Sequence, residues 1–532
     1  MSEAQSVLLA IVVALASILL AALGRRLPIP TAVLQVLGGL VVGLIPGAGA
    51  FRVSPDIVFF VFLPPVLWSA AFFTSFRDFK ANLRPIGLLA IGLVAATTVA
   101  VAVLAHHLLP GIPWAAAVAL GAIVSPPDAV AAEAILKRLP IPRRAVSVLL
   151  GESLVNDASA LILYRGAVAA LVGAAFSPGE WVVRFFLDAF VGILLGMLVG
   201  WFVIRAAAYT DDPLAHTVLT LVGPYLAWIS GEYLHVSAVL ACVAGGIYVR
   251  QRFSTVVPPA SRIQGRAVWD LLLFGLNSLI FVLLGAEFSN LLRAMSSEGL
   301  LRLARTGVLI AGLVIVLRLC WVPLAAAVPR WLSPRLRARD PMPGAVPIFI
   351  IAWTGMRGMV SLAAALALPR LTASGAPTPF RAEIVLLTVV VILVTLVLQG
   401  LTLIPLFKRL PLAEDSALTD EEAHARAEAR RAALEHLDDL AQEPWVTAAA
   451  VAQVKSEVDT SAAPADAVRG AAAAPAPGQV ALRLRLEVLD AQRRALVQLR
   501  DEGAISDDVL LLLESELDYE ALRLGGSIPR AG

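Results

Sequence analysis

Long apolar stretches recur along this chain, and they constrain its fold more than any other feature of the sequence. A helix needs about 20 mostly apolar residues to cross a hydrocarbon core about 30 Å thick. Because 59% of the residues are hydrophobic and only 15% are charged, the composition is also that of a membrane protein. The chain is therefore predicted to be an all-α polytopic membrane protein with thirteen transmembrane helices, near 6–23, 31–47, 54–74, 85–109, 113–136, 145–174, 180–208, 213–231, 235–250, 268–292, 303–328, 343–369 and 381–407.

Basic residues are distributed unevenly between the loops that join these spans. Most lysine and arginine residues follow odd-numbered spans, among them Arg84, Arg144 and Arg330, whereas few follow even-numbered spans. Cytoplasmic loops carry the excess of Lys and Arg in membrane proteins. The N-terminus is therefore expected outside the membrane and the C-terminus in the cytoplasm.

The last 122 residues differ in character from the rest. Residues 411–532 carry 23 acidic and 12 basic side chains, a net charge of −11, and the total of +2 leaves +13 on residues 1–410. Two helical stretches near 418–442 and 480–524 flank an Ala/Pro-rich linker. We predict a transmembrane domain over 1–410 and a cytoplasmic, acidic, helical tail over 411–532. A charged helical tail is usually a solvated appendage, and a regulatory or dimer-contacting role is the alternative.

Two of the predicted spans contain features that break a helix in the middle of the membrane. In the span at 113–136, Pro126 and Pro127 remove backbone donors immediately before Asp128, so the helix must open there. The span at 343–369 carries small and polar residues and a charge at its centre: Thr354, Gly355, Arg357, Gly358 and Ser361. Irregular backbone at this depth is tolerated where it is buried in protein or lines a cavity. Both breaks are therefore predicted to line an internal site.

The two breaks also stand at matching positions of the chain. They are seven spans apart, so spans one to six and eight to thirteen are predicted to be two copies of a six-helix unit. The copies have opposite orientation, because seven is odd. Paired broken helices in inverted repeats mark the central site of many transporters. The pattern predicts two inverted six-helix repeats whose broken helices cross at mid-membrane.

The predicted span at 145–174 carries a cluster of polar residues in an otherwise apolar sequence. At about 100° per residue, they lie at roughly 0°, 40°, 100° and 140° around the helix, in the order Glu152, Asn156, Ser153 and Asp157. Ser153 and Asp157 can offer oxygen atoms to a hard cation. A carboxylate at this depth either takes a proton or binds a cation such as Na⁺, and it cannot readily do both. This competition in one side chain is the chemistry of an antiporter.

Five stretches of the sequence resemble one protein family. In chain order they are VSPPDAVAAEAI, GESLVNDASAL, NSLIFVLLGAEF, WTGMRGMVSLAAALALP and LLTVVVILVTLVLQGLTLIPLFKRL. Together they resemble the bacterial sodium/proton antiporters of the monovalent cation:proton antiporter-1 family, which are relatives of the eukaryotic sodium/proton exchangers. The resemblance covers residues 1–410, and the tail also looks like the tails of many bacterial members.

This resemblance implies a homodimer in which a six-helix core domain moves against a dimerisation domain in an elevator-like motion. It implies exchange of Na⁺, with Li⁺ or K⁺ as alternatives, for H⁺ across the bacterial inner (plasma) membrane. It implies no enzyme activity, no cofactor and no nucleic-acid partner.

The resemblance also assigns roles to residues. The family's Asn-Asp pair corresponds to Asn156 and Asp157, with Asp157 as the carrier of the cation or proton. The implied set of cation- or proton-binding residues is Asp157, Asp128, Ser153 and Asn156, of which Asp157, Asp128 and Ser153 hold the monovalent cation. A structural ion pair is implied between Glu152 and Arg357.

This chain departs from its relatives at two positions. Many relatives have threonine before the span-five aspartate, where this chain has Pro127. Archaeal relatives have a glutamate in span three where this chain has Ser69. One hydroxyl and one carboxylate are therefore missing from the family's ligand set.

Other classes of protein fit the sequence less well. An intramembrane aspartyl protease also carries two aspartates on separate spans, but in Tyr-Asp and Gly-x-Gly-Asp contexts, whereas this chain has Pro-Pro-Asp and Asn-Asp. A cation channel is expected to show a symmetric pore loop or a charged ring, and an ATP-driven pump a phosphate-binding loop; neither pattern occurs. A potassium/proton antiporter of the same fold stays the main alternative.

The ratio of protons to cations exchanged is predicted from one position in the sequence. Relatives that export one Na⁺ for two protons carry Asp-Asp where this chain has Asn156 and Asp157. An amide cannot release a proton in the physiological range, so the pair offers one titrating group. The sequence predicts electroneutral 1:1 exchange.

Overall fold

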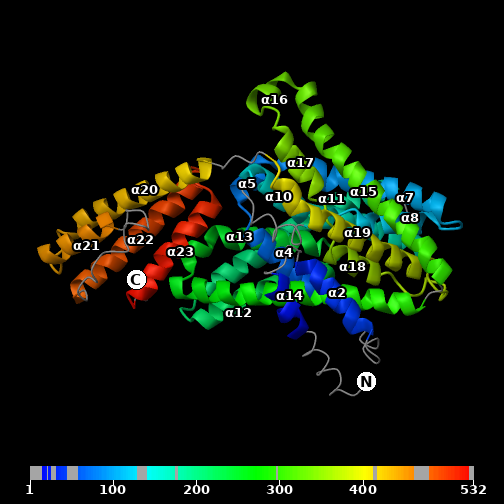
Figure 1. Cartoon of the computed structure of the whole chain (residues 1–532). Coiled ribbons are helices and arrows are strands. Elements are labelled where there is room, and N and C mark those ends of the chain that lie inside the picture. The colour runs from blue at the N-terminus through cyan, green and yellow to red at the C-terminus, as the bar shows by residue number, and fades with distance from the viewer. Residues whose placement is uncertain are drawn as a thin grey trace, which may run out of the picture.

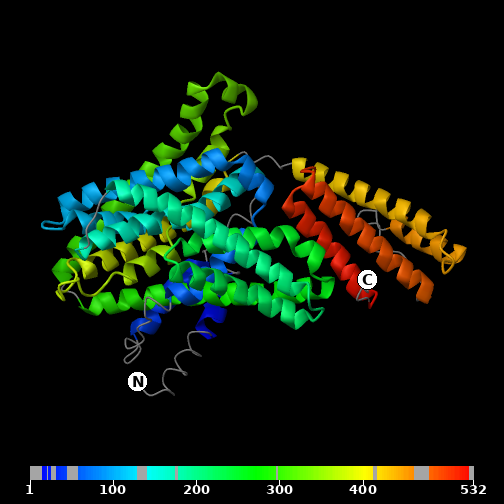
Figure 2. The ribbon, with the colours of Figure 1, turned by 180° about the vertical axis from the view of Figure 1, so that it is seen from behind.

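The structure of this chain, a computed structural model, is helical. It describes residues 15–20, 22–24, 31–44, 58–128, 141–173, 178–294, 297–410, 416–460 and 478–525. Within these ranges there is no strand and only an isolated bridge between Leu371 and Pro377. Figures 1 and 2 show a dense body of crossing helices from which the C-terminal helices extend to one side. The all-α prediction is confirmed.

Helices occupy the positions of predicted spans two to thirteen. They are α2 (Thr31–Leu44), η2 (Val58–Phe62), α4 (Leu63–Phe72), α5 (Phe76–Ala81), α6 (Leu83–Gly87), η3 (Leu88–Leu93), α7 (Val94–Leu108), α8 (Trp114–Val124), α10 (Arg143–Leu171), α11 (Pro178–Ala207), α12 (Pro213–Tyr233), α13 (Ala238–Val256), α14 (Pro259–Ala294), α15 (Ser297–Leu332), α16 (Pro334–Arg339), α17 (Ala345–Trp353), α18 (Met359–Leu366) and α19 (Arg381–Phe407). Seven helices in the described ranges are long and apolar enough to cross a membrane, and four other apolar helices are shorter. Much of the first predicted span and residues 129–136 of the fifth lie outside the described residues, so the total of thirteen stays a prediction.

The centre of the body is built from helices that are apolar on all sides. Helix α19 has fully buried residues along most of its length, from Ile384 to Phe407, and it packs against α8, α15 and α18. A helix that is hydrophobic all round belongs in such a core. Helix α8 is rich in alanine, and a Cβ added at Gly121 would lie 2.3 Å from the carbonyl oxygen of Thr98 on α7. Small residues therefore let α7 and α8 approach closely beside α19.

Three predicted cytoplasmic loops meet at one carboxylate, that of Asp340. It accepts hydrogen bonds from Arg144 at 2.8 and 3.1 Å, from Arg330 at 2.8 Å, and from Arg84. These bonds, with that from Arg144 the strongest cause, hold the pKa of Asp340 well below its usual range. The three loops thus lie on the same side of the body, in agreement with the alternation that the basic residues predict.

The acidic tail forms four helices where the sequence predicts two. They are α20 (Ser416–Leu440), α21 (Ala448–Thr460), α22 (Gln479–Asp501) and α23 (Asp507–Arg523). The predicted stretch 480–524 is divided at a turn in which Gly503 has a φ of +75°. The tail has its own apolar core, which includes Leu437, Val454, Leu484 and Val488.

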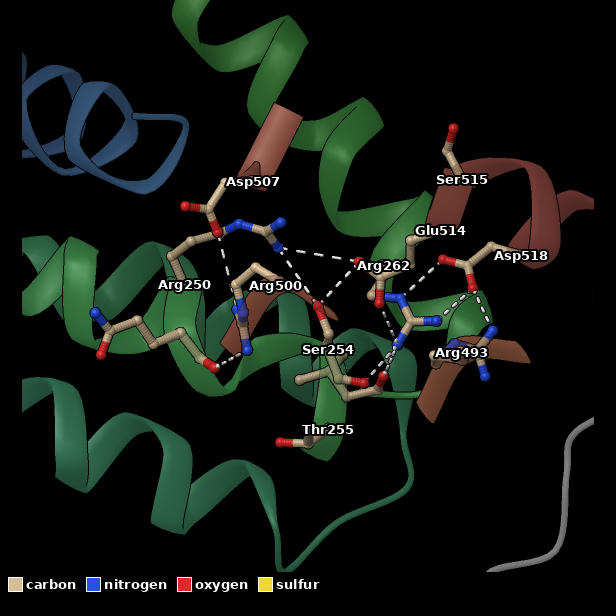
Figure 3. Close-up of polar contacts among 12 residues, drawn as sticks. Arg250, Ser254, Thr255, Arg262, Arg493, Arg500, Asp507, Glu514, Ser515 and Asp518 are labelled. Carbon is tan, nitrogen blue, oxygen red and sulfur yellow. Dashed lines mark hydrogen bonds and ion pairs between the residues drawn. The ribbon is translucent and has the colours of Figure 1, made fainter. Parts of the chain in front are cut away.

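The tail is also docked on the membrane part, so the prediction of a solvated appendage is wrong. On α23, Glu514 and Asp518 are each only 3% exposed. Ser254 at the end of α13 donates to Glu514 at 2.9 Å, and Arg262 on α14 donates to Asp518 at 2.8 Å, as Figure 3 shows. A buried carboxylate needs a charged or hydrogen-bonding partner. The basic ends of α13 and α14, which are predicted to be cytoplasmic, supply those partners, and composition alone does not reveal this.

Candidate cation site at the crossing of two broken helices

Both predicted helix breaks are present. Helix α8 ends at Val124, and Ser125 to Asp128, which include Pro126 and Pro127, are not helical. Helix α17 ends at Trp353 and α18 begins only at Met359. The two breaks contact each other, and this contact organises the site.

Asp128 lies in the first break and contacts the second, at the point where the two broken helices cross. Its backbone N–H donates to the carbonyl of Met356 at 2.7 Å, and its carboxylate accepts the N–H of Met359 at 3.1 Å, at the first turn of α18. A carboxylate is stabilised at a helix N-terminus by the unpaired N–H groups there. The fit depends on Gly358, because an added Cβ would lie 1.7 Å from the Asp128 carboxylate oxygen. The glycine that the sequence marks as a helix break is thus also required for close approach.

Arg357 lies in the second break and binds the backbone of the first. Its side chain is fully buried, and it donates to the carbonyls of Val124 at 3.1 Å and Ser125 at 3.4 Å, as well as to Gly355. These are carbonyls at the C-terminal end of α8, which have no partner within the helix. Arg357 therefore caps α8 with a positive charge, where the helix dipole favours one.

The implied pair of Glu152 with Arg357 is wrong. Glu152, 1% exposed, instead forms a bidentate ion pair with Arg318 of α15, which is 0% exposed; one of the two bonds measures 2.8 Å. Arg318 also donates to the carbonyl of Ile351, near the end of α17, at 3.0 and 3.2 Å. The guanidinium of Arg357 is engaged by the carbonyls of α8, so a second arginine serves Glu152. Each broken helix thus has its own capping arginine.

Gly355 makes room for this second arginine. A Cβ at Gly355 would lie 2.5 Å from the Cδ atom of Arg318. The sequence marks Arg318 as an arginine deep in a span but does not show its partner, because the two residues are 166 positions apart.

The polar face of α10 points to the same crossing. Asn156 donates to the carbonyl of Pro127 at 3.0 Å, so α10 is tied to the first break. Asp157, 8% exposed, forms no ion pair with any described residue, but the negative charge of Asp128 is near enough to act on it. Ser153, one turn before Asp157, is partly buried. The structure therefore brings Asn156, Asp157 and Asp128 together, whereas Ser153 forms no hydrogen bond with either aspartate.

Three buried oxygen atoms at the crossing have no hydrogen-bond partner among the described residues. They are Oδ1 of Asn156, Oγ1 of Thr354 and Oγ of Ser361. They come from α10, from the second break and from α18. Carboxylate, amide and hydroxyl oxygens are the ligands that hard cations prefer. These oxygen types are those of a cation site, and Thr354 and Ser361 are candidate additions to the predicted set.

Two residues of α19 that contact the second break were not predicted from the sequence. Thr395 accepts the N–H of Arg357 at 3.2 Å, and Gln399 donates to the carbonyl of Trp353 at 2.9 Å. Both side chains thus link α19 to the second break by hydrogen bonds. The available signal was their four-residue spacing in an apolar span.

Ser69 lies elsewhere. It donates to the carbonyl of Val66 and lines a cavity of about 450 Å³ between α4, α12, α14 and the tail helix α23. The position where archaeal relatives carry a glutamate is therefore a serine at the junction with the tail in this chain.

Comparisons with known proteins point to one family. The family model of the transmembrane sodium/hydrogen exchanger matches residues 11–409. An uncharacterised Na⁺/H⁺ exchanger of Mycobacterium tuberculosis is 36% identical over 508 residues, which cover 94% of this chain and 93% of that protein. A sodium, potassium, lithium and rubidium/H⁺ antiporter of Bacillus pumilus is 34% identical over 431 residues, which cover 77% of this chain and 62% of that protein.

A solved structure shares the fold. The sodium proton antiporter MjNhaP1 from Methanocaldococcus jannaschii aligns with a TM-score of 0.58 and 19% identity, over 75% of this chain and 100% of that one. The relatives are transporters, which excludes the alternative of an intramembrane protease. From its sequence, its two crossed helix breaks and these relationships, the chain belongs to the sodium/hydrogen exchanger family of transmembrane ion transporters.

Proposed function

We propose that this chain exchanges a monovalent cation for H⁺ across the bacterial inner membrane, with Asp157 as the carrier. The observation that supports this role is that Asp157 is a buried carboxylate without an ion-pair partner among the described residues. The other acidic groups of the site are engaged: Glu152 with Arg318, and Asp128 with the N-terminus of α18. A carboxylate without a fixed partner is the group that can exchange a proton for a cation.

The proposed cation ligands are Asp157, Asp128 and Ser153, with the amide oxygen of Asn156. The unpartnered oxygens of Thr354 and Ser361 complete the set. Na⁺ is the proposed substrate because most of the named relatives are Na⁺/H⁺ exchangers or antiporters. K⁺ is the alternative, since a Bacillus relative is named for sodium, potassium, lithium and rubidium.

The proposed mechanism is elevator-like movement of a core that contains α8, α10, α17 and α18. Contacts between these helices support their movement as one unit: Asn156 binds the backbone of Pro127, and Arg357 binds that of Val124. The remaining proposals are two inverted repeats, a homodimer, a transmembrane domain over 1–410 with a tail over 411–532, and a cytoplasmic C-terminus. The convergence of three basic loops on Asp340 supports that orientation.

We propose electroneutral 1:1 exchange. The amide of Asn156 donates to Pro127 and cannot titrate. Asp128 is stabilised as an anion by the N–H of Met359, and Glu152 by Arg318. One exchangeable carboxylate then carries one proton in one direction or one cation in the other.

The test of the carrier is Asp157→Asn in proteoliposomes, with proton flux driven by Na⁺, Li⁺ or K⁺ gradients. The amide keeps the shape of the side chain and removes its charge, so exchange should fall to the background of empty liposomes for all three ions. The matched control is Asp188→Asn, which removes a carboxylate from α11 that pairs with Arg184. Wild-type flux in Asp157→Asn liposomes contradicts the assignment.

The test of the stoichiometry uses the same liposomes with the membrane potential clamped by K⁺ and valinomycin. Imposed voltage should neither drive Na⁺ uptake nor change the equilibrium Na⁺ ratio. A voltage-dependent Na⁺ ratio means that Asp128 or Glu152 also titrates.

A further inference from the structure

A pocket of about 570 Å³ lies on the predicted cytoplasmic side, away from the crossing. The charged residues that line it are Arg84, Arg143, Arg144, Arg339, Asp78 and Asp340. They come from the short helices α5 and α6, from the beginning of α10, and from α16 with the residue after it. Segments far apart in the sequence thus build one basic pocket.

The positive charge of the pocket is not balanced. Asp340 is shared by Arg84, Arg144 and Arg330, and Asp78 pairs with Arg143, which also binds Glu421 of the tail. Among the described residues, the lining itself holds four arginines and two carboxylates, a net charge of +2. Arg339 forms no ion pair with any described residue, and the Arg144 side chain is 46% exposed. Arg144 and Arg339 therefore have donors left for another anion.

The pocket lies where three candidate membrane spans begin or end. These spans are Leu83–Leu108, Arg143–Leu171 and Glu298–Leu332. Basic residues at the ends of spans lie at the depth of the lipid headgroups on the cytoplasmic side. The pocket is therefore within reach of phospholipid phosphates rather than deep in the protein.

Exposed apolar side chains adjoin Arg84 of the pocket and Arg330, which binds Asp340 without lining the pocket. Leu83 precedes Arg84 and is 52% exposed, while Trp331 and Leu332 follow Arg330 and are 79% and 68% exposed. In Figure 1, α16 and the adjoining end of α15 stand out from the body of the protein. Tryptophan is favoured at the membrane interface, where its ring lies at headgroup level. Apolar side chains beside a basic pocket fit a lipid better than a soluble phosphate.

We propose that this pocket binds the phosphate of an anionic phospholipid from the cytoplasmic leaflet. Guanidinium groups can bind phosphate oxygens in bidentate fashion, and the pocket offers the arginines of three segments. Leu83, Trp331 and Leu332 contact the glycerol and the upper acyl chains. The proposal does not depend on the transported ion or on the role of Asp157.

The test is thermal melting of the full-length protein in detergent, titrated with phosphatidylglycerol or with phosphatidylcholine. Phosphatidylglycerol should raise the melting temperature, and phosphatidylcholine should not. In Arg339→Gln the apparent affinity for phosphatidylglycerol should fall about fivefold, and in Arg144→Gln/Arg339→Gln about 25-fold. The matched control is Arg335→Gln/Arg337→Gln, which removes two exposed charges of α16 that do not line the pocket; its affinity should stay within about twofold of wild type.

Three results overturn the proposal. Equal stabilisation by the two lipids shows that the pocket does not select an anion. An equal loss in the control variant shows diffuse attraction to a basic surface. The same shift with glycerol phosphate or inorganic phosphate assigns the pocket to a soluble anion. If the melting temperature of the double variant without lipid differs from that of wild type, the proposal is judged on Arg339→Gln alone, because Arg339 has no ion pair among the described residues.

Discussion

Neutralising one partner of the pair between Glu152 and Arg318 is expected to destabilise the protein strongly. Both side chains are almost completely buried, and they share two hydrogen bonds. Removing one partner of a buried pair costs about 3–5 kcal/mol, because the other charge is left without compensation. Glu152→Gln should therefore lower the free energy of unfolding by about that amount.

Arg318→Gln should cost more than Glu152→Gln. Arg318 also donates two bonds to the carbonyl of Ile351, and an unsatisfied buried carbonyl costs about 1–3 kcal/mol in addition. The sum is about 4–8 kcal/mol. The double variant Glu152→Gln/Arg318→Gln leaves no isolated charge, so it should lose only about 1–3 kcal/mol, the part that belongs to Ile351.

The assay is reversible unfolding in mixed micelles by titration with sodium dodecyl sulfate, for the two single variants and the double variant. The double variant should be more stable than either single variant, which gives a large coupling energy between the two positions. The control cycle combines Glu152→Gln with Arg357→Gln, and it should show a smaller coupling. Stronger coupling of Glu152 to Arg357 than to Arg318 refutes the reasoning and restores the pair that the family resemblance implies.

Three further predictions concern other parts of the molecule. Gly358→Ala should abolish exchange in proteoliposomes while the protein still inserts, because the new Cβ would overlap the carboxylate of Asp128; unchanged exchange contradicts the close approach. Asp518→Asn should speed hydrogen exchange of the α23 amides, measured by mass spectrometry, whereas Glu516→Gln, whose side chain is 51% exposed, should not. Asp340→Asn should lower the melting temperature at pH 7. Because the pKa of Asp340 is depressed in the folded state, the stabilisation that its carboxylate provides is present above about pH 4 and is lost only as the pH falls further. A difference from wild type that disappears between pH 7 and pH 5 contradicts that sign.

Local sequence patterns were sufficient for features that depend on a few neighbouring residues. Pro126 and Pro127 predicted the break in α8, because proline removes a backbone donor wherever it stands. The glycines at 355 and 358 predicted the second break. The four-residue spacing of Ser153 and Asp157 predicted a polar helical face, because helical periodicity is fixed by backbone geometry.

Features that depend on which helices become neighbours could not be predicted in this way. The sequence presents Arg318 and Arg357 as two arginines buried in spans, and nothing local indicates which of them reaches Glu152. Their roles are decided where α15 and the second break pack against α10, since a guanidinium pairs with the acceptors within its reach.

The tail shows the same division between sequence and tertiary structure. Its sequence predicted that the tail is helical, because helix formation depends on short segments, although four helices are present where two were predicted. Its docking was decided only by the fold, which brings the basic ends of α13 and α14 opposite the carboxylates of α23. The sequence by itself thus determined the membrane class, the helix breaks and the polar face that carries Asp157. Tertiary structure decided the partners of each buried charge, because electrostatic partners are selected by distance in space and not by separation along the chain.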